Sequence, residues 1–280
     1  MTALAQRMSP PAWTGAVLRL ASIALVAAIW ISSAIFGFYI LAYYGGAIPA
    51  GTLTDWNETL PRLYEAETPG ASAGIGLHFF AGAVLLLFGP IQLISQVRAK
   101  APAVHRWIGR IYALAAFLAG AGGLAFIAIK GTVGGMPMTI GFAMYGGLMI
   151  IAAAQTVRHA MARSIDIHRA WAVRLFALAI GSWLYRMCYG FWFLFSGRDN
   201  PGHTREFSGW FDYVMDFAFF IPPLFVAEMF IRSRRGQAST AGRIATTTAL
   251  TGGAAFIALA TFFFTLYGWG PAIAMRFGAA

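Results

Sequence analysis

Two histidines begin similar sequence motifs, and side chains of this type at matching positions could bind one cofactor. The motifs are residues 105–112 (HRWIGRIY) and residues 168–176 (HRAWAVRLF). Each places a His-Arg pair, a tryptophan, a second arginine and an aromatic residue in the same order, and each continues into an apolar stretch. We therefore predict a tandem repeat of one helix pair, with His105 and His168 at the starts of helices on the same membrane face.

Histidine supports several chemistries at such a place. An imidazole ring can be an axial ligand of a b-type haem, one ligand of a metal ion, or a proton donor to a quinone. Nearby guanidinium groups suit haem propionates or lipid phosphates, although the positive-inside rule would also explain these arginines without a cofactor. The candidate cofactor-binding residues are His105, Arg106, Arg110, His168, Arg169 and Arg174, and the candidate metal ligands are His105 and His168.

A second group of polar residues lies inside apolar stretches, where ionisable side chains are costly. It consists of His78, Tyr185, Arg186 and Asp216. We predict an ion pair between Arg186 and Asp216, because a buried charge is stabilised by an opposite charge. Such a pair either lines a polar path or only holds two helices together. A single histidine likewise either binds a ligand or makes a helix–helix hydrogen bond.

The composition defines the class of protein. Of the 280 residues, 59% are hydrophobic and 11% are charged, which leaves too little polar surface for a soluble domain. The net charge of +10 comes from basic residues between apolar stretches, so the predicted partner is membrane lipid and not nucleic acid. The single cysteine, Cys188, excludes internal disulfides and thiolate metal clusters. No sequence motif of an ATPase, a zinc protease or a serine hydrolase is present.

Seven apolar stretches are long enough to cross a hydrocarbon core of ~30 Å as helices. They cover residues 17–44, 75–96, 108–129, 138–157, 171–195, 211–231 and 244–269. We predict an all-α polytopic membrane protein of one domain, in which the second to fifth spans form a four-helix core built from the tandem repeat. Its parts are a cytoplasmic tail (1–16), an external loop (45–73), the repeat core (75–195) and the last two spans (211–269).

The basic residues predict the orientation of the chain. With the amino terminus inside, 14 of the 20 Lys and Arg residues fall on the inner face, as the positive-inside rule requires. Seven spans then place the carboxyl terminus outside. The predicted location is the inner membrane of a bacterium.

Several motifs together resemble a known family. His78, Gly89-Pro90 and Gln92, followed by the two His-Arg motifs, are similar to an uncharacterised family of bacterial multi-pass membrane proteins known only as a domain of unknown function. The resemblance covers about residues 75–232 and implies a fold and a topology, without an activity to transfer. The predicted core is also similar, more loosely, to cytochrome b561-like proteins, although this chain lacks their four-histidine pattern.

Two classes of function follow from these residues. The first is a redox or redox-accessory role, in which a haem or a quinone binds near His105 and His168 and other membrane redox proteins are the partners. The second is a non-redox carrier, channel or assembly factor, in which His78, Arg186 and Asp216 line a path for protons or a small anion.

Overall fold

All regular structure in the described part of the chain is helical, as the composition predicts. The computed structural model describes residues 11–59, 62–197 and 200–277, so most of the predicted tail (1–16) lies outside the described residues. Six helical stretches in this part are long and apolar enough to cross a membrane. They contain α1 (Ala12–Ile40), α3 (Pro69–Leu93), α5 (Pro102–Lys130), α6 (Gly135–Met161), α9 (Trp210–Ala218) with α10 (Ile221–Arg234), and α11 (Thr240–Phe264).

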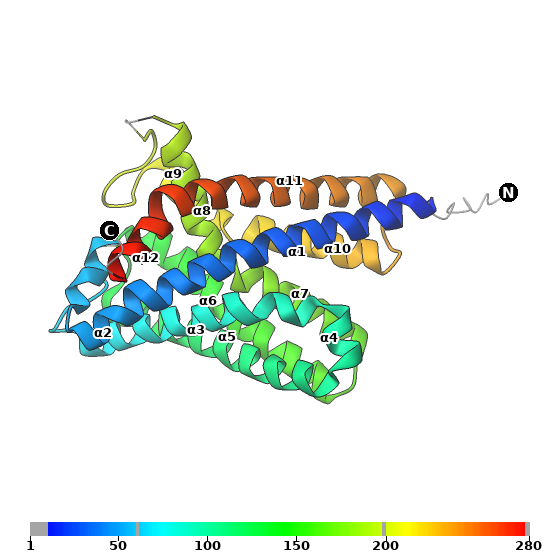
Figure 1. Ribbon diagram of the computed structural model, residues 1–280, viewed down its shortest axis with the longest axis horizontal. Helices are drawn as coiled ribbons and strands as arrows, with labels where there is room; N and C mark the ends of the chain where they lie inside the picture. The colour runs from blue at the N-terminus through cyan, green and yellow to red at the C-terminus, as the bar shows by residue number, and fades with distance from the viewer. Residues whose placement is uncertain (1–10, 60–61, 198–199, 278–280) are drawn as a thin grey trace.

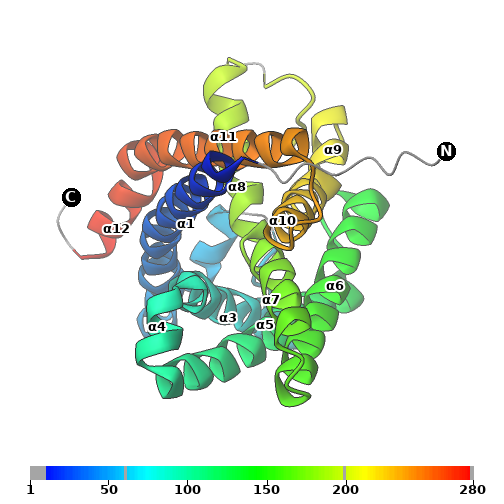
Figure 2. The same cartoon turned by 90° about the vertical axis from the view of Figure 1, so that its right-hand side faces the viewer.

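The helices form a bundle in which neighbours in sequence are mostly neighbours in space (Figures 1 and 2). Helix α3 packs against α5, α5 against α6, and α6 against α7 (Ile165–Ala179), while α7 also touches α3. These four helices correspond to the predicted core. Helix α1 covers α3 on one side and packs along α11, and α10 packs against α7 and α11.

The predicted fifth span is broken into two helices. Helix α7 and helix α8 (Gly181–Phe195) have 15 residues each and meet at Ile180, so neither is as long as the other spans. The ring of Tyr145 on α6 packs against Gly181, where a Cβ atom would lie 2.9 Å from it. The Tyr145 hydroxyl donates a hydrogen bond of 2.8 Å to the carbonyl oxygen of Leu178, which satisfies a backbone group beside the break.

The sixth stretch is also broken, just before the pair Pro222-Pro223. Helix α9 ends at Ala218, and α10 begins at Ile221 with Pro222 in its first turn, where a missing N–H group does no harm. The carboxyl end of this stretch carries Arg232 and Arg234.

Glycines bring α3 and α5 into close contact. A Cβ atom on Gly122 would lie 2.5 Å from the carbonyl oxygen of Gly74, and one on Gly74 would lie 2.9 Å from the carbonyl oxygen of Gly122. The two backbones therefore touch directly, in the manner of small-residue interfaces between membrane helices. Gly120 and Gly146 make a similar contact between α5 and α6.

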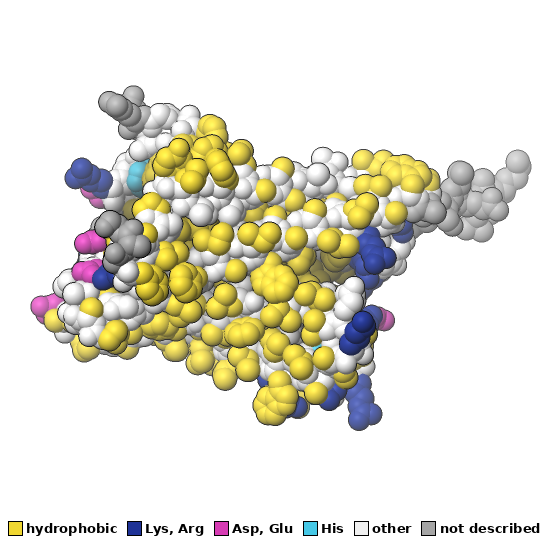
Figure 3. Space-filling view, viewed as in Figure 1, with side chains coloured by type: hydrophobic (Ala, Val, Ile, Leu, Met, Phe, Trp, Pro, Cys, Tyr) yellow, Lys and Arg dark blue, Asp and Glu magenta, His cyan; other side chains and the backbone are white. Residues whose placement is uncertain are grey.

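Charged residues gather at opposite ends of the bundle, and apolar side chains cover the surface between them (Figure 3). The basic end contains α4 (Ser95–Lys100), the starts of α5 and α7, and the end of α10. The acidic end contains α2 (Gly46–Ala50), the loop that follows it, and α12 (Gly270–Arg276). This separation is the pattern from which the orientation was predicted.

Ion pairs hold the acidic end together. Arg276 contacts the carboxylate of Asp55 at 2.6 Å, and Lys130 contacts that of Glu65 at 2.8 Å. The hydrogen bond from Arg276 lowers the pKa of Asp55 below its usual value, and the hydrogen bond from Lys130 does the same to the pKa of Glu65. The first pair ties the last helix of the chain to the predicted external loop.

Candidate functional site

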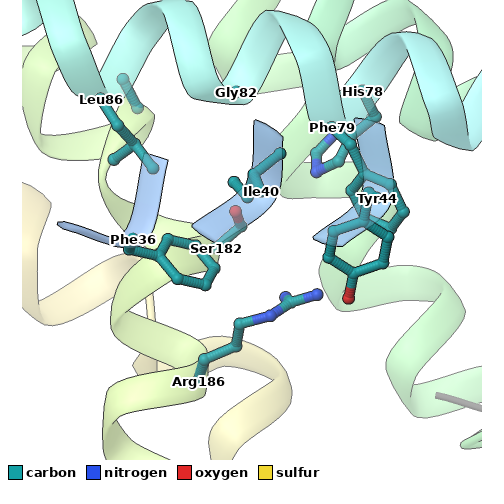
Figure 4. A pocket seen from close by; sticks show the side chains of 10 residues that line it. Phe36, Ile40, Tyr44, His78, Phe79, Gly82, Leu86, Ser182 and Arg186 are labelled. Carbon is teal, nitrogen blue, oxygen red and sulfur yellow. The ribbon is translucent and has the colours of Figure 1, made fainter. Parts of the chain in front are cut away.

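A small cavity lies inside the bundle, between α1, α3 and the junction of α7 with α8. Its volume is about 20 Å³, which is room for about one water molecule. Figure 4 shows the Arg186 side chain extending from α8 toward the hydroxyl of Tyr44, with the His78 ring on the wall formed by α3. The lining consists of Phe36, Ile40, Tyr44, His78, Phe79, Gly82, Leu86, Ala179, Ser182 and Arg186.

Arg186 has no carboxylate partner in the part of the chain that the structure describes. Its guanidinium group makes no ion pair there; it lies beside the hydroxyl of Tyr44 (Figure 4) and 5.7 Å from the centroid of the Phe36 ring. Two other partly buried arginines, Arg174 and Arg276, have carboxylate partners at 2.7 and 2.6 Å, whereas Arg98 and Arg243, close to the basic end, have none among the described residues. A lone cation beside a cavity is unusual in a membrane helix, where charges are normally paired.

One ring nitrogen of His78 makes a hydrogen bond to α5, and the other has no partner among the described residues. Its Nδ1 atom lies 2.9 Å from the carbonyl oxygen of Ala119 on α5, and since a carbonyl only accepts, Nδ1 is the donor. The Nε2 atom remains available for a water molecule, a proton or a ligand. On the same wall, Gly82 has open space where a Cβ atom would be.

Two residues of the cavity, Tyr44 and Ser182, were not among the predicted site residues. Tyr44 is 1% exposed because α1 continues into a π-helical turn, Leu41–Gly45, which directs both Tyr43 and Tyr44 inward. Such turns are frequent at functional sites, but a tyrosine near the end of a span usually belongs to the interfacial aromatic belt. The sequence therefore offered no signal that separates Tyr44 from an anchor residue.

The predicted ion pair between Arg186 and Asp216 is wrong. Asp216 is fully buried, and neither of its carboxylate oxygens has a hydrogen-bond partner in the structure. Asp216 packs against Gly141 of α6, whereas Arg186 faces α1 and α3. The two residues lie on different sides of α8, so the second predicted group is divided between two places.

Tyr185, the fourth residue of that group, lies on the same side of α8 as Asp216. Its ring packs against Phe142 of α6 at a centroid distance of 5.3 Å, and its hydroxyl donates a hydrogen bond of 3.3 Å to the hydroxyl of Tyr189. It is therefore not part of the Arg186 cavity.

At the basic end, His105 and His168 lie in the first turns of α5 and α7, as predicted. The Nδ1 atom of His168 lies 2.9 Å from the carbonyl oxygen of Thr156, whereas the Nδ1 atom of His105 is buried without a partner among the described residues. The side-chain amide nitrogen of Gln92 and the hydroxyl of Tyr112 are also buried there without a partner.

The arginines predicted to bind a cofactor have other surroundings. Arg106, Arg110 and Arg169 are exposed, and Arg174 donates two hydrogen bonds, of 3.0 and 2.7 Å, to Glu228 of α10. The guanidinium groups of Arg110 and Arg174 stack on Trp107 and Trp171, each at 4.9 Å from the ring centroid. The same contact thus occurs in both copies of the motif.

These features define a multi-pass helical membrane protein with polar groups enclosed in its bundle. The chain belongs to the family DUF2306, described as a predicted membrane protein, whose model matches residues 75–231. The match agrees with the range over which the sequence resembles an uncharacterised membrane family. No curated protein and no solved structure matches the chain, so the looser similarity to cytochrome b561-like proteins is not shown.

Proposed function

We propose that this protein transports a small monovalent anion through the membrane and holds it in the cavity at Arg186. The observation behind this proposal is the guanidinium group of Arg186, without a carboxylate partner, beside a small cavity. A fixed charge in a medium of low dielectric constant strongly favours a mobile ion of opposite sign. An anion would supply the partner that no described carboxylate supplies.

The size of the cavity limits the ligand. A volume of about 20 Å³ fits an ion of the size of chloride and is too small for a quinone ring or a haem. Ser182 adds a hydroxyl group, which donates hydrogen bonds to anions, and the Phe36 ring covers one side of the guanidinium group. The Tyr44 hydroxyl donates to Thr59 at 2.7 Å and presents its oxygen atom to the cavity.

The break in the fifth stretch supports the same location. Membrane transporters commonly bind substrates where a helix is interrupted near the middle of the bilayer, because the amino-terminal end of a half-helix attracts anions. Ala179 and Ser182 flank the break at Ile180 and both line the cavity.

Chloride uptake into proteoliposomes tests the proposal. Arg186→Gln removes the charge, and Gly82→Leu fills the cavity from a position where the backbone leaves open space. We expect each change to reduce uptake at least about tenfold, equivalent to ~1.4 kcal/mol. Arg110→Gln, an exposed arginine at the basic end, is the matched control and should leave uptake unchanged. Equal uptake by all four proteins would refute the proposal.

A second function, a redox or redox-accessory role, is favoured by the polar atoms at the basic end. His105, Gln92 and Tyr112 each bury a polar atom that lacks a partner in the described residues, and His168 is oriented by Thr156, as metal-bound histidines often are. A quinone there would offer carbonyl oxygens to the N–H group of Gln92 and the hydroxyl of Tyr112, whereas a haem iron would take up a histidine nitrogen alone. The absorbance spectrum of the purified protein tests this, because a bound b-type haem gives a Soret band that His105→Ala should abolish.

A further inference from the structure

One buried titratable group has no part in the anion site. Asp216 on α9 is 0% exposed, and both of its carboxylate oxygens lack a partner in the described part of the chain. Burying an ionised carboxylate without a partner costs far more than burying the neutral acid. A carboxyl group in this position therefore holds a proton at rest.

A chain of hydrogen bonds runs from the neighbourhood of Asp216 to the surface of the acidic end. The Tyr185 hydroxyl donates to the Tyr189 hydroxyl at 3.3 Å, and Tyr189 donates to Oδ1 of Asp212 at 2.7 Å. His203 shares the same oxygen at 2.8 Å, and its side chain is 17% exposed. Two side chains, Tyr189 and Asp212, thus connect a membrane-embedded phenol to an imidazole that reaches solvent.

Tyr185 and Asp216 face the same interface between α6, α8 and α9. Gly141 of α6 lies against the backbone of Asp216, and the next residue, Phe142, contacts the Tyr185 ring. Phe219, one turn after Asp216, also contacts Tyr185, with ring centroids 5.4 Å apart. No direct bond joins Tyr185 to Asp216, so the last step needs a water molecule or a side-chain rotation.

We propose that Asp216 is a proton-binding site inside the membrane, and that Tyr185, Tyr189, Asp212 and His203 form the relay that exchanges its proton with the acidic end. Since a carboxylate only accepts, Tyr189 must donate to Asp212. Both tyrosine hydroxyls are therefore oriented to pass protons from Asp216 toward Asp212. Tyr189 gives its hydroxyl proton to Asp212 and receives one from Tyr185, and Tyr185 receives one from Asp216. Asp216 becomes a carboxylate as Asp212 becomes a neutral acid, and the two tyrosines end as they began. His203 donates from Nδ1 to Asp212 at rest, so its ring must turn until the unprotonated nitrogen faces Asp212; that nitrogen then takes the proton and His203 becomes an imidazolium.

The groups around this relay are few. The titratable side chains facing Asp216 and Tyr185 are Asp212 on the same helix, Tyr189 on α8 and Tyr145 on α6, whose hydroxyl is engaged by Leu178. Arg186 points to the cavity on the other side of α8. The proton site is therefore separate from the anion site, and either can fail without the other.

Infrared spectroscopy of the protein in nanodiscs, without added anion, tests the inference. We expect a carbonyl band of a protonated carboxyl group that Asp216→Asn removes. After transfer to D2O, Tyr189→Phe and Tyr185→Phe should slow the deuterium shift of that band at least about tenfold, because each removes one hydroxyl and keeps the ring. Tyr213→Phe is the control, because Tyr213 is an exposed tyrosine on the same helix as Asp216. The inference is overturned if the band is absent at neutral pH, if it survives Asp216→Asn, or if the tyrosine variants exchange like the wild type.

Discussion

Asp212 and Asp216 lie one turn apart on α9 and are both 0% exposed, yet one carboxylate accepts four hydrogen bonds and the other accepts none. Asp212 receives Tyr189 and His203 on one oxygen and the backbone N–H groups of Thr204 and Gly209 on the other. It therefore organises the start of its helix as well as the proposed relay. Asp216 accepts no hydrogen bond of this kind from the described residues.

Replacing Asp212 and Asp216 by asparagine should have unequal effects on stability. Asp212→Asn weakens several charge-assisted hydrogen bonds and should lower the free energy of unfolding by about 2–4 kcal/mol. Asp216→Asn should change it by less than ~1 kcal/mol, because a buried neutral acid is replaced by a neutral amide of the same shape. Unfolding of the two purified variants in detergent with increasing denaturant measures both values. A larger loss for Asp216→Asn would show that this carboxyl group is ionised and paired.

Arg186 and Asp216 should behave as independent residues. Because they face different sides of α8, the effects of Arg186→Gln and Asp216→Asn on the free energy of unfolding should add to within ~0.5 kcal/mol in the double variant. A double-mutant cycle gives the coupling directly. A coupling of several kcal/mol would restore the ion pair that the sequence suggested.

The sequence predicts which residues lie inside the membrane better than it predicts toward which neighbouring helix their side chains point. The sequence pairs Arg186 with Asp216 because a buried charge is stabilised by an opposite charge. Neighbouring residues on a helix point about 100° apart, however, and which faces meet depends on how all the helices pack. The break at Ile180 has a similar origin, since Tyr145 on another helix stabilises it. The all-helical membrane fold was predictable because it follows from composition alone.

The contact between α3 and α5 should be sensitive to a single methyl group. Gly122→Ala places a Cβ atom 2.5 Å from the carbonyl oxygen of Gly74, so the helices must separate, at a cost of about 1–3 kcal/mol. Gly252→Ala on α11, where the space is open, should be neutral or slightly stabilising. Thermal unfolding of both variants checks this, and equal melting temperatures would contradict the close contact.

The acidic end should loosen in acid. The pKa of Asp55 is lowered by Arg276, so the unfolded chain binds a proton at a higher pH than the folded chain does. The stabilisation is complete above the ordinary pKa of about 4 and disappears as the pH falls through the lowered value. Asp55→Asn should flatten this part of the stability profile, whereas Glu67→Gln, an exposed acid in the same loop, should not. Identical profiles for wild type and Asp55→Asn would contradict the role of this pair.

The predicted topology places the two ends of the last span on opposite sides of the membrane. A reporter placed after Ala280 should lie on the outer side, and one inserted at Gly236, after the basic end of α10, should lie in the cytoplasm. The ion pair of Arg276 with Asp55 requires the end of the chain and the 45–73 loop to share a side. Both reporters on the same side would contradict the seven-span prediction.

The claim that Arg186 binds an anion is tested most directly by calorimetric titration of the purified protein with chloride. We expect one chloride ion per chain for the wild type, weaker binding for Arg186→Lys, and no measurable binding for Arg186→Gln or Gly82→Leu, while Arg110→Gln binds like the wild type. Chloride binding that is unchanged in Arg186→Gln, or absent from the wild type, would contradict it.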